Sequence, residues 1–69
     1  MSSMLIQVNG EQRSLDKSVS ILEFLLALDL NPKMLVVEHN GAIVPRDKYA
    51  ETLLQSGDEF EIVQMMAGG

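Results

Sequence analysis

The segment "SVSILEFLLALDLNP", residues 18–32, is the part of this sequence in which apolar residues recur at helical spacing. Intervals of three and four residues predict an amphipathic helix over about Val19 to Leu30. Its apolar face is expected to pack Leu22, Leu25 and Leu26 against a sheet. The segments before and after it show strand-like patterns, so the sequence predicts a domain in which one helix covers one sheet.

The ends of this helix have recognisable signals. Two serines are candidates for the N-cap: Ser18, and Ser20, which forms the S-x-x-E pattern of a capping box with Glu23. The pattern leaves the choice between them open. Pro32 is expected to stop the helix, because the residue before a proline avoids the α region.

Two hairpins are predicted, one before the helix in the sequence and one after it. Each contains an Asn-Gly pair, Asn9-Gly10 in the first and Asn40-Gly41 in the second. This pair favours a type I′ turn, because both central residues of that turn need a positive φ. Pro45 ends the second hairpin, since proline has no N–H to donate to a neighbouring strand. The four strands are expected at about residues 4–8, 11–15, 35–38 and 42–44.

The rest of the chain completes the sheet. A short turn or helical loop is expected around residues 47–50, then a brief strand near 52–54 and a turn at Ser56-Gly57-Asp58. A last strand begins where Phe60 and Ile62 alternate with glutamates. The order predicts a single α+β domain over residues 1–69, with a mixed sheet of four to five strands and one main helix across one face. The last strand is expected in the middle of the sheet, beside the first.

Composition narrows the classes of function. The chain has 69 residues, five basic and ten acidic, with a net charge of −5 and no cysteine. Nucleic-acid binding draws on clustered lysine and arginine, and here the basic residues are scattered, so neither nucleic acid nor an anionic membrane is an expected partner. The start "MSSMLIQV" lacks the features of a signal peptide, and the absence of cysteine fits a reducing cytoplasm.

The residues that commonly carry chemistry form no convincing catalytic or metal site. His39 is the single histidine, and a solvated side chain at the hairpin shoulder is expected. Asp58, Glu59 and Glu61 form an acidic cluster that is expected to be a solvated edge, because acid–base catalysis needs a cleft that shifts one pKa. Met65 and Met66 are candidates for the core or for an apolar contact surface, with the core favoured for one of them.

The last residues, Gly68 and Gly69, directly follow the final apolar segment. Residues 66–69 are expected to form a flexible tail. Glycine has no Cβ and adopts any φ, which suits a chain that must pass closely through another protein's site. The terminal carboxylate is ionised and unreactive at neutral pH, so it becomes an acyl donor only after activation, for example as an adenylate.

Several of these motifs occur together in a known order. The sequence has Asn40-Gly41, Val44-Pro45-Arg46, Tyr49, Leu53 or Leu54, Gly57-Asp58, Glu61-Ile62-Val63 and the terminal Gly68-Gly69. In this order and at these spacings the chain closely resembles the sulfur carrier proteins of thiamine biosynthesis, the ThiS family. The first half agrees in order and length, through Asn9-Gly10 and the leucine-rich helix. Many relatives carry an aliphatic or aromatic pair and often a third glycine where this chain has Met65-Met66-Ala67, residues expected to contact partners.

The resemblance implies a ubiquitin-like β-grasp fold and a carrier, or protein co-substrate, rather than an enzyme. It implies that Gly69 is the covalent site and that Gly68 is required for activation. An ATP-dependent activating enzyme, an adenylyltransferase, would adenylate Gly69, and sulfur originating from a cysteine desulfurase would convert it to a thiocarboxylate. Thiazole synthase would use that sulfur. No cofactor or metal is expected on the carrier, since the ATP belongs to the activating enzyme.

Two alternatives share the same features. One is the small subunit of molybdopterin synthase, a sulfur carrier with the same fold and tail, whose relatives tend to be longer and often have a proline near the tail. This chain has no proline after Pro45, which favours thiamine. The other is a ubiquitin-like modifier whose Gly69 would form isopeptide bonds with target lysines.

Overall fold

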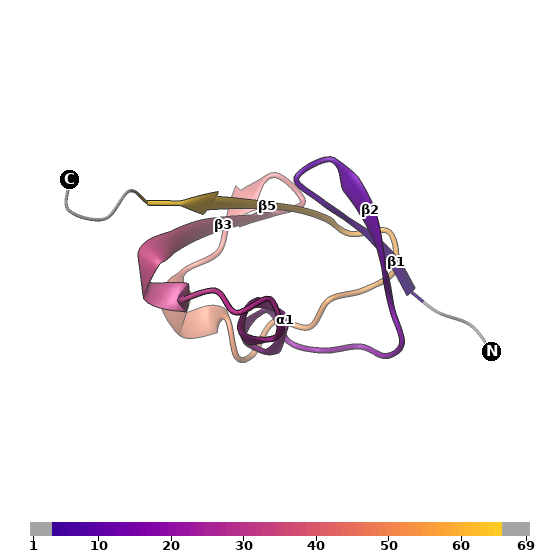
Figure 1. Ribbon diagram of the computed structural model, residues 1–69, viewed down its shortest axis with the longest axis horizontal. Coiled ribbons are helices and arrows are strands. Elements are labelled where there is room, and N and C mark those ends of the chain that lie inside the picture. Colours follow the sequence, from indigo (N-terminus) through magenta and orange to yellow (C-terminus); the bar gives the residue numbers. More distant parts are fainter. Residues whose placement is uncertain (1–3, 66–69) are drawn as a thin grey trace.

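The computed structural model describes residues 4–65. Its strands are β1 (Met4–Val8), β2 (Glu11–Leu15), β3 (Leu35–His39), β4 (Ala42–Ile43) and β5 (Glu59–Gln64). One α-helix, α1 (Ile21–Ala27), and two 3₁₀ turns, η1 (Pro32–Met34) and η2 (Arg46–Lys48), complete the described elements. Figure 1 shows α1 beneath the sheet, with β5 and β3 running side by side above it.

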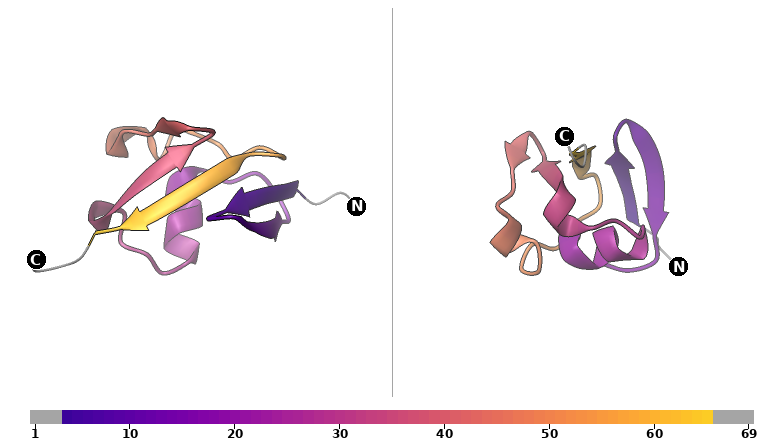
Figure 2. Two further views of the ribbon diagram at one scale, coloured as in Figure 1. Left: turned by 90° about the horizontal axis from the view of Figure 1, so that it is seen from above. Right: turned by 60° about the vertical axis from the view of Figure 1, so that its left-hand side comes forward.

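The five strands form one mixed sheet in the order β2-β1-β5-β3-β4. The last strand in the sequence is therefore the middle strand of the sheet, as predicted. β5 runs parallel to β1 and antiparallel to β3. Both views in Figure 2 place α1 against a single face of the sheet, so the predicted arrangement of one helix across one face is confirmed.

Both predicted hairpin turns are present. Asn9 and Gly10 have φ values of 53° and 84°, and Asn40 and Gly41 have 53° and 88°. These are the paired positive φ angles of a type I′ turn, whose twist matches that of the flanking strands. In the first hairpin the turn sets the register, with Val8 opposite Glu11.

The helix begins at the second of the two candidate serines. The Ser20 hydroxyl accepts the Glu23 N–H at 3.0 Å, and the Glu23 carboxylate accepts the Ser20 N–H at 2.9 Å, which completes a capping box. The Ser18 hydroxyl instead donates to the Leu54 carbonyl at 2.9 Å. The brief strand expected near residues 52–54 is reduced to one bridge between Ser20 and Leu53.

The helix ends earlier than predicted. It closes at Ala27, because Asp29 takes a left-handed conformation with φ 63°. The Leu30 N–H then bonds the Leu25 carbonyl at 3.0 Å, and the Asp29 N–H bonds the Leu26 carbonyl at 3.0 Å. This is a Schellman motif, which satisfies the last helical carbonyls without the expected stop at Pro32.

The buried face of the helix also differs from the prediction. Leu25 is fully buried and Leu22 is half-buried, but Leu26 is 56% exposed. With the helix beginning after Ser20, its inner stripe is Ile21, Phe24 and Leu25, spaced three and four residues apart. The remaining buried core residues come from the sheet and the long connection: Ile6, Val8, Leu35, Val37, Tyr49, Leu54 and Phe60. Within residues 4–65 no helix is long and apolar enough to cross a membrane.

Replacing Leu25 with alanine should destabilise the domain by about 2–5 kcal/mol, because it removes a fully buried side chain and leaves a cavity. Leu26→Ala is the matched control on the adjacent, exposed position and should cost about 0.5 kcal/mol or less. Urea denaturation measures both. Equal losses for the two variants would contradict this orientation of the helix.

Candidate functional site

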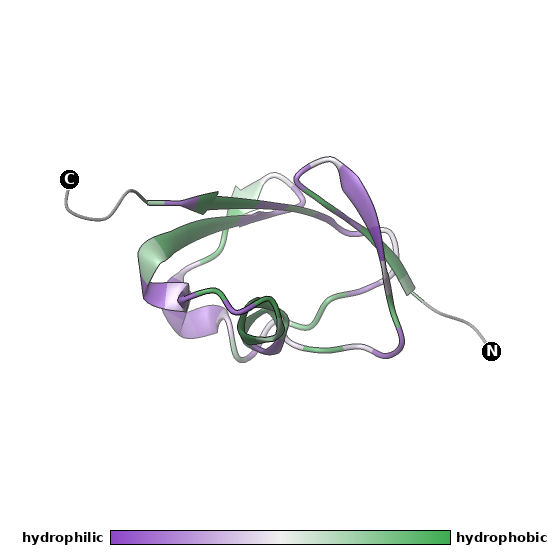
Figure 3. Ribbon diagram, viewed as in Figure 1, coloured by the Kyte–Doolittle hydropathy of each residue, from purple (hydrophilic) through white to green (hydrophobic). Residues whose placement is uncertain are grey.

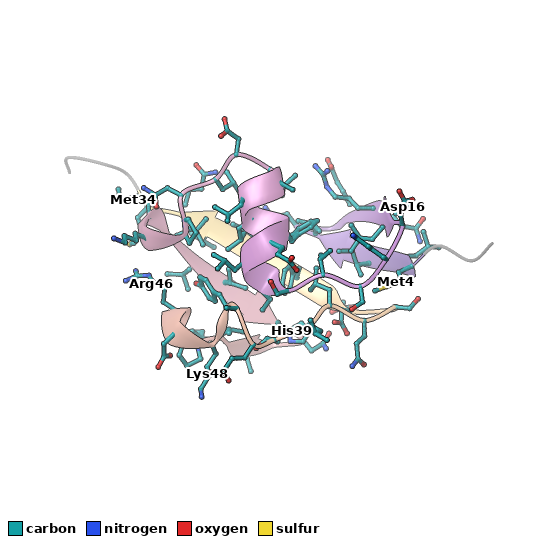
Figure 4. The ribbon with its side chains drawn as sticks, turned by 90° about the horizontal axis from the view of Figure 1, so that it is seen from below. Met4, Asp16, Met34, His39, Arg46 and Lys48 are labelled. Carbon is teal, nitrogen blue, oxygen red and sulfur yellow. The ribbon has the colours of Figure 1, made fainter. Side chains whose placement is uncertain are left out.

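The candidate site begins where β5 leaves the sheet. The last described residue, Met65, donates its N–H to the Met34 carbonyl at 2.8 Å, so β3 and η1 hold the chain up to this point. Figure 4 places Met34 at the opposite end of the molecule from Met4. The predicted covalent site Gly69, its neighbour Gly68, and Met66 and Ala67 lie outside the described residues. Met65 is 44% exposed, which excludes it from the core and leaves it available for contact.

The Asn9 side chain fastens β5 from the β1 side. The Asn9 backbone N–H bonds the Phe60 carbonyl at 2.8 Å. Its side-chain Oδ1 then accepts the Ile62 N–H at 2.7 Å, and Nδ2 donates to the Ile62 carbonyl at 3.2 Å. Because the I′ turn diverts the Asn9 backbone away from β5, the side chain supplies the acceptor that a longer β1 would have provided.

Asn40 does the same from the β3 side. Its backbone N–H bonds the Glu59 carbonyl at 2.8 Å, and its Oδ1 accepts the Glu59 N–H at 2.8 Å. Its Nδ2 donates to Asp58 Oδ1 at 3.2 Å. Each Asn-Gly turn therefore shapes a hairpin and also holds the central strand. The sequence predicted the turns but not these side-chain contacts.

Asp58 is a buried carboxylate immediately before β5, so the prediction that it belongs to a solvated edge is wrong. Its Oδ2 lies 2.7 Å from His39 Nε2 and accepts the Gln55 N–H at 2.8 Å. Since an ionised carboxylate only accepts hydrogen bonds, His39 donates from Nε2. The prediction of a solvated His39 is also wrong, because the ring is half-buried and packs edge-on against Phe60, with centroids 5.4 Å apart.

The surroundings of Asp58 favour its charged form. Burial opposes ionisation, but hydrogen bonds from His39, the Gln55 N–H and Asn40 outweigh it and hold the pKa of Asp58 below its usual value. This network joins the second hairpin to the loop before β5. Across residues 4–65, no group of three or more His, Cys, Asp or Glu side chains is arranged to hold a metal ion. The hydrogen-bonded His39 and Asp58 side chains are best described as a structural anchor for β5.

The sheet face opposite the helix carries two distinct surfaces. Near the end of β5, Val63 lies opposite Val36, and Met65 follows Val63 by two residues; these three exposed side chains form the apolar patch. Towards the start of β5, Glu38 lies opposite Glu61, and Glu59 follows on the same face; these three form the acidic strip. In Figure 3 the helix α1 is coloured mainly as hydrophobic and the edge strand β2 mainly as hydrophilic. Glu59 and Glu61 are exposed, as predicted.

Comparisons with known proteins agree with this architecture. A model of the ThiS family matches residues 6–69. The sulfur carrier protein ThiS of Bacillus subtilis is 33% identical, over 94% of this chain and 100% of that protein. The crystal structure of the thiamine biosynthesis protein ThiS from Geobacter metallireducens has a TM-score of 0.83 and 32% identity, and covers 96% of this chain and 100% of that one. The thiazole synthase of Paramagnetospirillum magneticum is 35% identical over 66 residues, which are 96% of this chain. The chain spans only 20% of the length of that protein.

This protein has a ubiquitin-like β-grasp fold, as shown by its mixed sheet with one crossing helix and by its similarity to the Geobacter metallireducens crystal structure. This chain belongs to the ThiS family of sulfur carriers in thiamine biosynthesis. The predicted fold and family are confirmed.

Asp58→Asn should destabilise the domain at neutral pH by about 1–3 kcal/mol, because an amide group would face hydrogen-bond donors in a buried position. The folded pKa of Asp58 is depressed, so its contribution is present above the unfolded carboxyl pKa of about 3.9 and is lost as the pH falls through the folded pKa. The difference between wild type and variant should therefore narrow below about pH 4 in urea denaturation. Glu61→Gln, on the exposed face, is the control; a constant Asp58→Asn difference down to about pH 2 would contradict this assignment.

Proposed function

We propose that this chain carries sulfur as a thiocarboxylate on Gly69 and delivers it to thiazole synthase. The observation that carries the proposal is that the family match runs to residue 69 and so includes Gly68 and Gly69. The chain contains no cysteine, so the sulfur would be held at the C-terminus and not on a side chain. In this role the chain is a co-substrate of other enzymes and not itself a catalyst.

The chemistry requires activation because a carboxylate resists nucleophilic attack. In the proposed sequence, a carboxylate oxygen of Gly69 attacks the α-phosphorus of ATP in the activating enzyme, and diphosphate leaves. The terminal sulfur of a persulfide formed by a cysteine desulfurase then attacks the acyl carbon, and AMP leaves, which gives an acyl disulfide between Gly69 and the sulfur donor. A thiol reductant then supplies two electrons that break the S–S bond, which releases the donor as a thiol and leaves the thiocarboxylate on Gly69. The product has sulfur in place of one carboxylate oxygen. Glycine at both final positions lets the backbone pass close to the nucleotide.

The rigid placement of β5 supports this use of the tail. The strand is held in the sheet on one side by β3 and on the other by β1 and the Asn9 side chain. Its last described contact is between Met65 and Met34. Such anchoring fixes the point from which the tail must start, and so reduces the conformational freedom that would otherwise be lost on entering a partner's site.

Thiazole synthase as the sulfur acceptor is supported by two relatives with that name. The thiazole synthases of Paramagnetospirillum magneticum and Magnetococcus marinus each match 96% of this chain with 20% of their own length. A segment similar to this carrier therefore occurs within those proteins. The presence of a carrier-like segment and a thiazole synthase in one protein is consistent with a separate carrier chain that acts with a separate thiazole synthase.

The apolar patch and the acidic strip support docking of the activating enzyme on the sheet face opposite the helix, which we call the open face. The patch has the exposed aliphatic and methionine side chains typical of an adaptable protein interface. Glu38 and Glu61 lie directly opposite each other, which is unfavourable for the isolated sheet. A partner with an apolar centre and a basic rim would relieve that repulsion and set the orientation.

Incubated with ATP, the activating enzyme of its source organism and a sulfur donor, the protein should gain the mass difference of one oxygen-to-sulfur exchange at Gly69. Deleting Gly69 should abolish the exchange without unfolding the domain, and Gly68→Val should impair it, because a β-branched side chain would obstruct close passage of the backbone. Intact and fragment mass spectrometry locates the change. Sulfur on an internal residue would contradict the proposal, and isopeptide conjugates in place of free thiocarboxylate would favour the modifier alternative.

Val63→Asp should weaken binding to the activating enzyme by about tenfold or more, because it places a charge in the centre of the apolar patch. Leu26→Asp is the matched control: Leu26 is 56% exposed, close to the 59% of Val63, but lies on the helix at the other side of the sheet. Titration calorimetry measures both affinities. Equal weakening by both changes would contradict docking on the open face.

A further inference from the structure

The hydrogen bonds of β5 alternate between its two neighbours. Asn40 bonds the Glu59 carbonyl and Met65 bonds the Met34 carbonyl, so odd-numbered residues of β5 direct their backbone groups towards β3. Even-numbered residues direct theirs the other way, towards β1. Gln64 is the last of these.

β1 is too short to pair with the end of β5. The pairing of β1 with β5 stops at Val8 and Phe60, and the Asn9 side chain then satisfies both backbone groups of Ile62. Within residues 4–65, neither a strand nor a side-chain hydrogen bond reaches the backbone of Gln64 on this side. In the left view of Figure 2 the yellow end of β5 runs on past the tips of the indigo β1–β2 hairpin.

This open edge differs from the two outer edges of the sheet. Exposed strand edges tend to pair with other chains unless they are short, charged or interrupted by proline. β2 carries Glu11 and Arg13, and β4 has only two residues and is followed closely by Pro45. The open edge at the end of β5 is limited to Gln64, but the segment Ile62-Val63-Gln64-Met65 around it has neither a charged side chain nor a proline.

The length of the tail brings a partner to this edge. Four residues follow Met65, and a fully extended chain of that length spans about 14 Å at most. If Gly69 is to enter a nucleotide site in the activating enzyme, the backbone of that enzyme must surround the tail within this distance of Met65. The first unpaired N–H and C=O that it meets on the sheet are those of Gln64.

We propose that an extended segment of the activating enzyme pairs with the open edge of β5 at Gln64, in the position that a longer β1 would occupy. The inference rests on the proposed function, since it takes the activating enzyme as the partner. Main-chain hydrogen bonds supply affinity that does not depend on the partner's side chains, as in other cases of strand addition. They also align the tail along the partner's own strand before the glycines reach the nucleotide.

Hydrogen exchange and one proline variant test the pairing. In the free protein the Gln64 amide should exchange rapidly, and in the complex with the activating enzyme its exchange should slow by at least about tenfold. Gln64→Pro removes the N–H on the open side while leaving the hydrogen bonds to β3 in place, and should weaken binding by about two- to tenfold, the range for one hydrogen bond. Gln64→Ala, which keeps the N–H, should bind like wild type.

The outcomes separate this inference from the proposed function. Unchanged exchange of the Gln64 amide in a complex that adenylates Gly69 would overturn the pairing and leave the carrier role intact. Equal binding by Gln64→Pro and Gln64→Ala would also overturn it. Failure of the wild-type protein to bind or to be adenylated would overturn both. Thermal unfolding of each variant confirms that the domain is folded in every comparison.

Discussion

Two asparagine side chains hold the last strand of this protein in the middle of its sheet, and the rest of the structure depends on them. β5 must insert between two hairpins formed by earlier segments. At the turn of each hairpin the backbone leaves the sheet, so its carbonyl cannot bond β5. The Oδ1 atoms of Asn9 and Asn40 replace these carbonyls, at 2.7 and 2.8 Å from the N–H groups of Ile62 and Glu59. Asparagine suits both tasks, since it tolerates positive φ and carries an amide.

Much of the fold is predictable from the sequence because it rests on local chemistry. The Asn-Gly pairs specify I′ turns through their backbone preferences, and the capping box at Ser20 needs only residues three apart. The end of the helix was not predictable in this way. Asp29 takes a left-handed conformation that no glycine signals, and Leu26 turns outward because Ile21, not Leu22, leads the buried stripe.

The contacts that position the candidate site are mostly between residues far apart in the sequence. His39 and Asp58 are 19 residues apart, and each was expected to be solvated; the sheet brings them together and buries the carboxylate. The apolar patch likewise depends on the register that sets Val36 opposite Val63. The role predicted for the terminal glycines came from the resemblance to a family, since the physical chemistry of a glycine pair alone permits several functions.

The central strand combines two opposite requirements along its length. Its first half is anchored through Asp58, Phe60 and the two asparagines, which is what a stable core needs. Its second half has exposed apolar side chains on one face and an unpaired edge, features that stability alone disfavours. The proposed function gives a physical reason: a partner that received Gly69 would have to approach to within about 14 Å of Met65 and would therefore cover the end of the strand. The surface that is unfavourable in the free carrier is the surface that such a partner would bury.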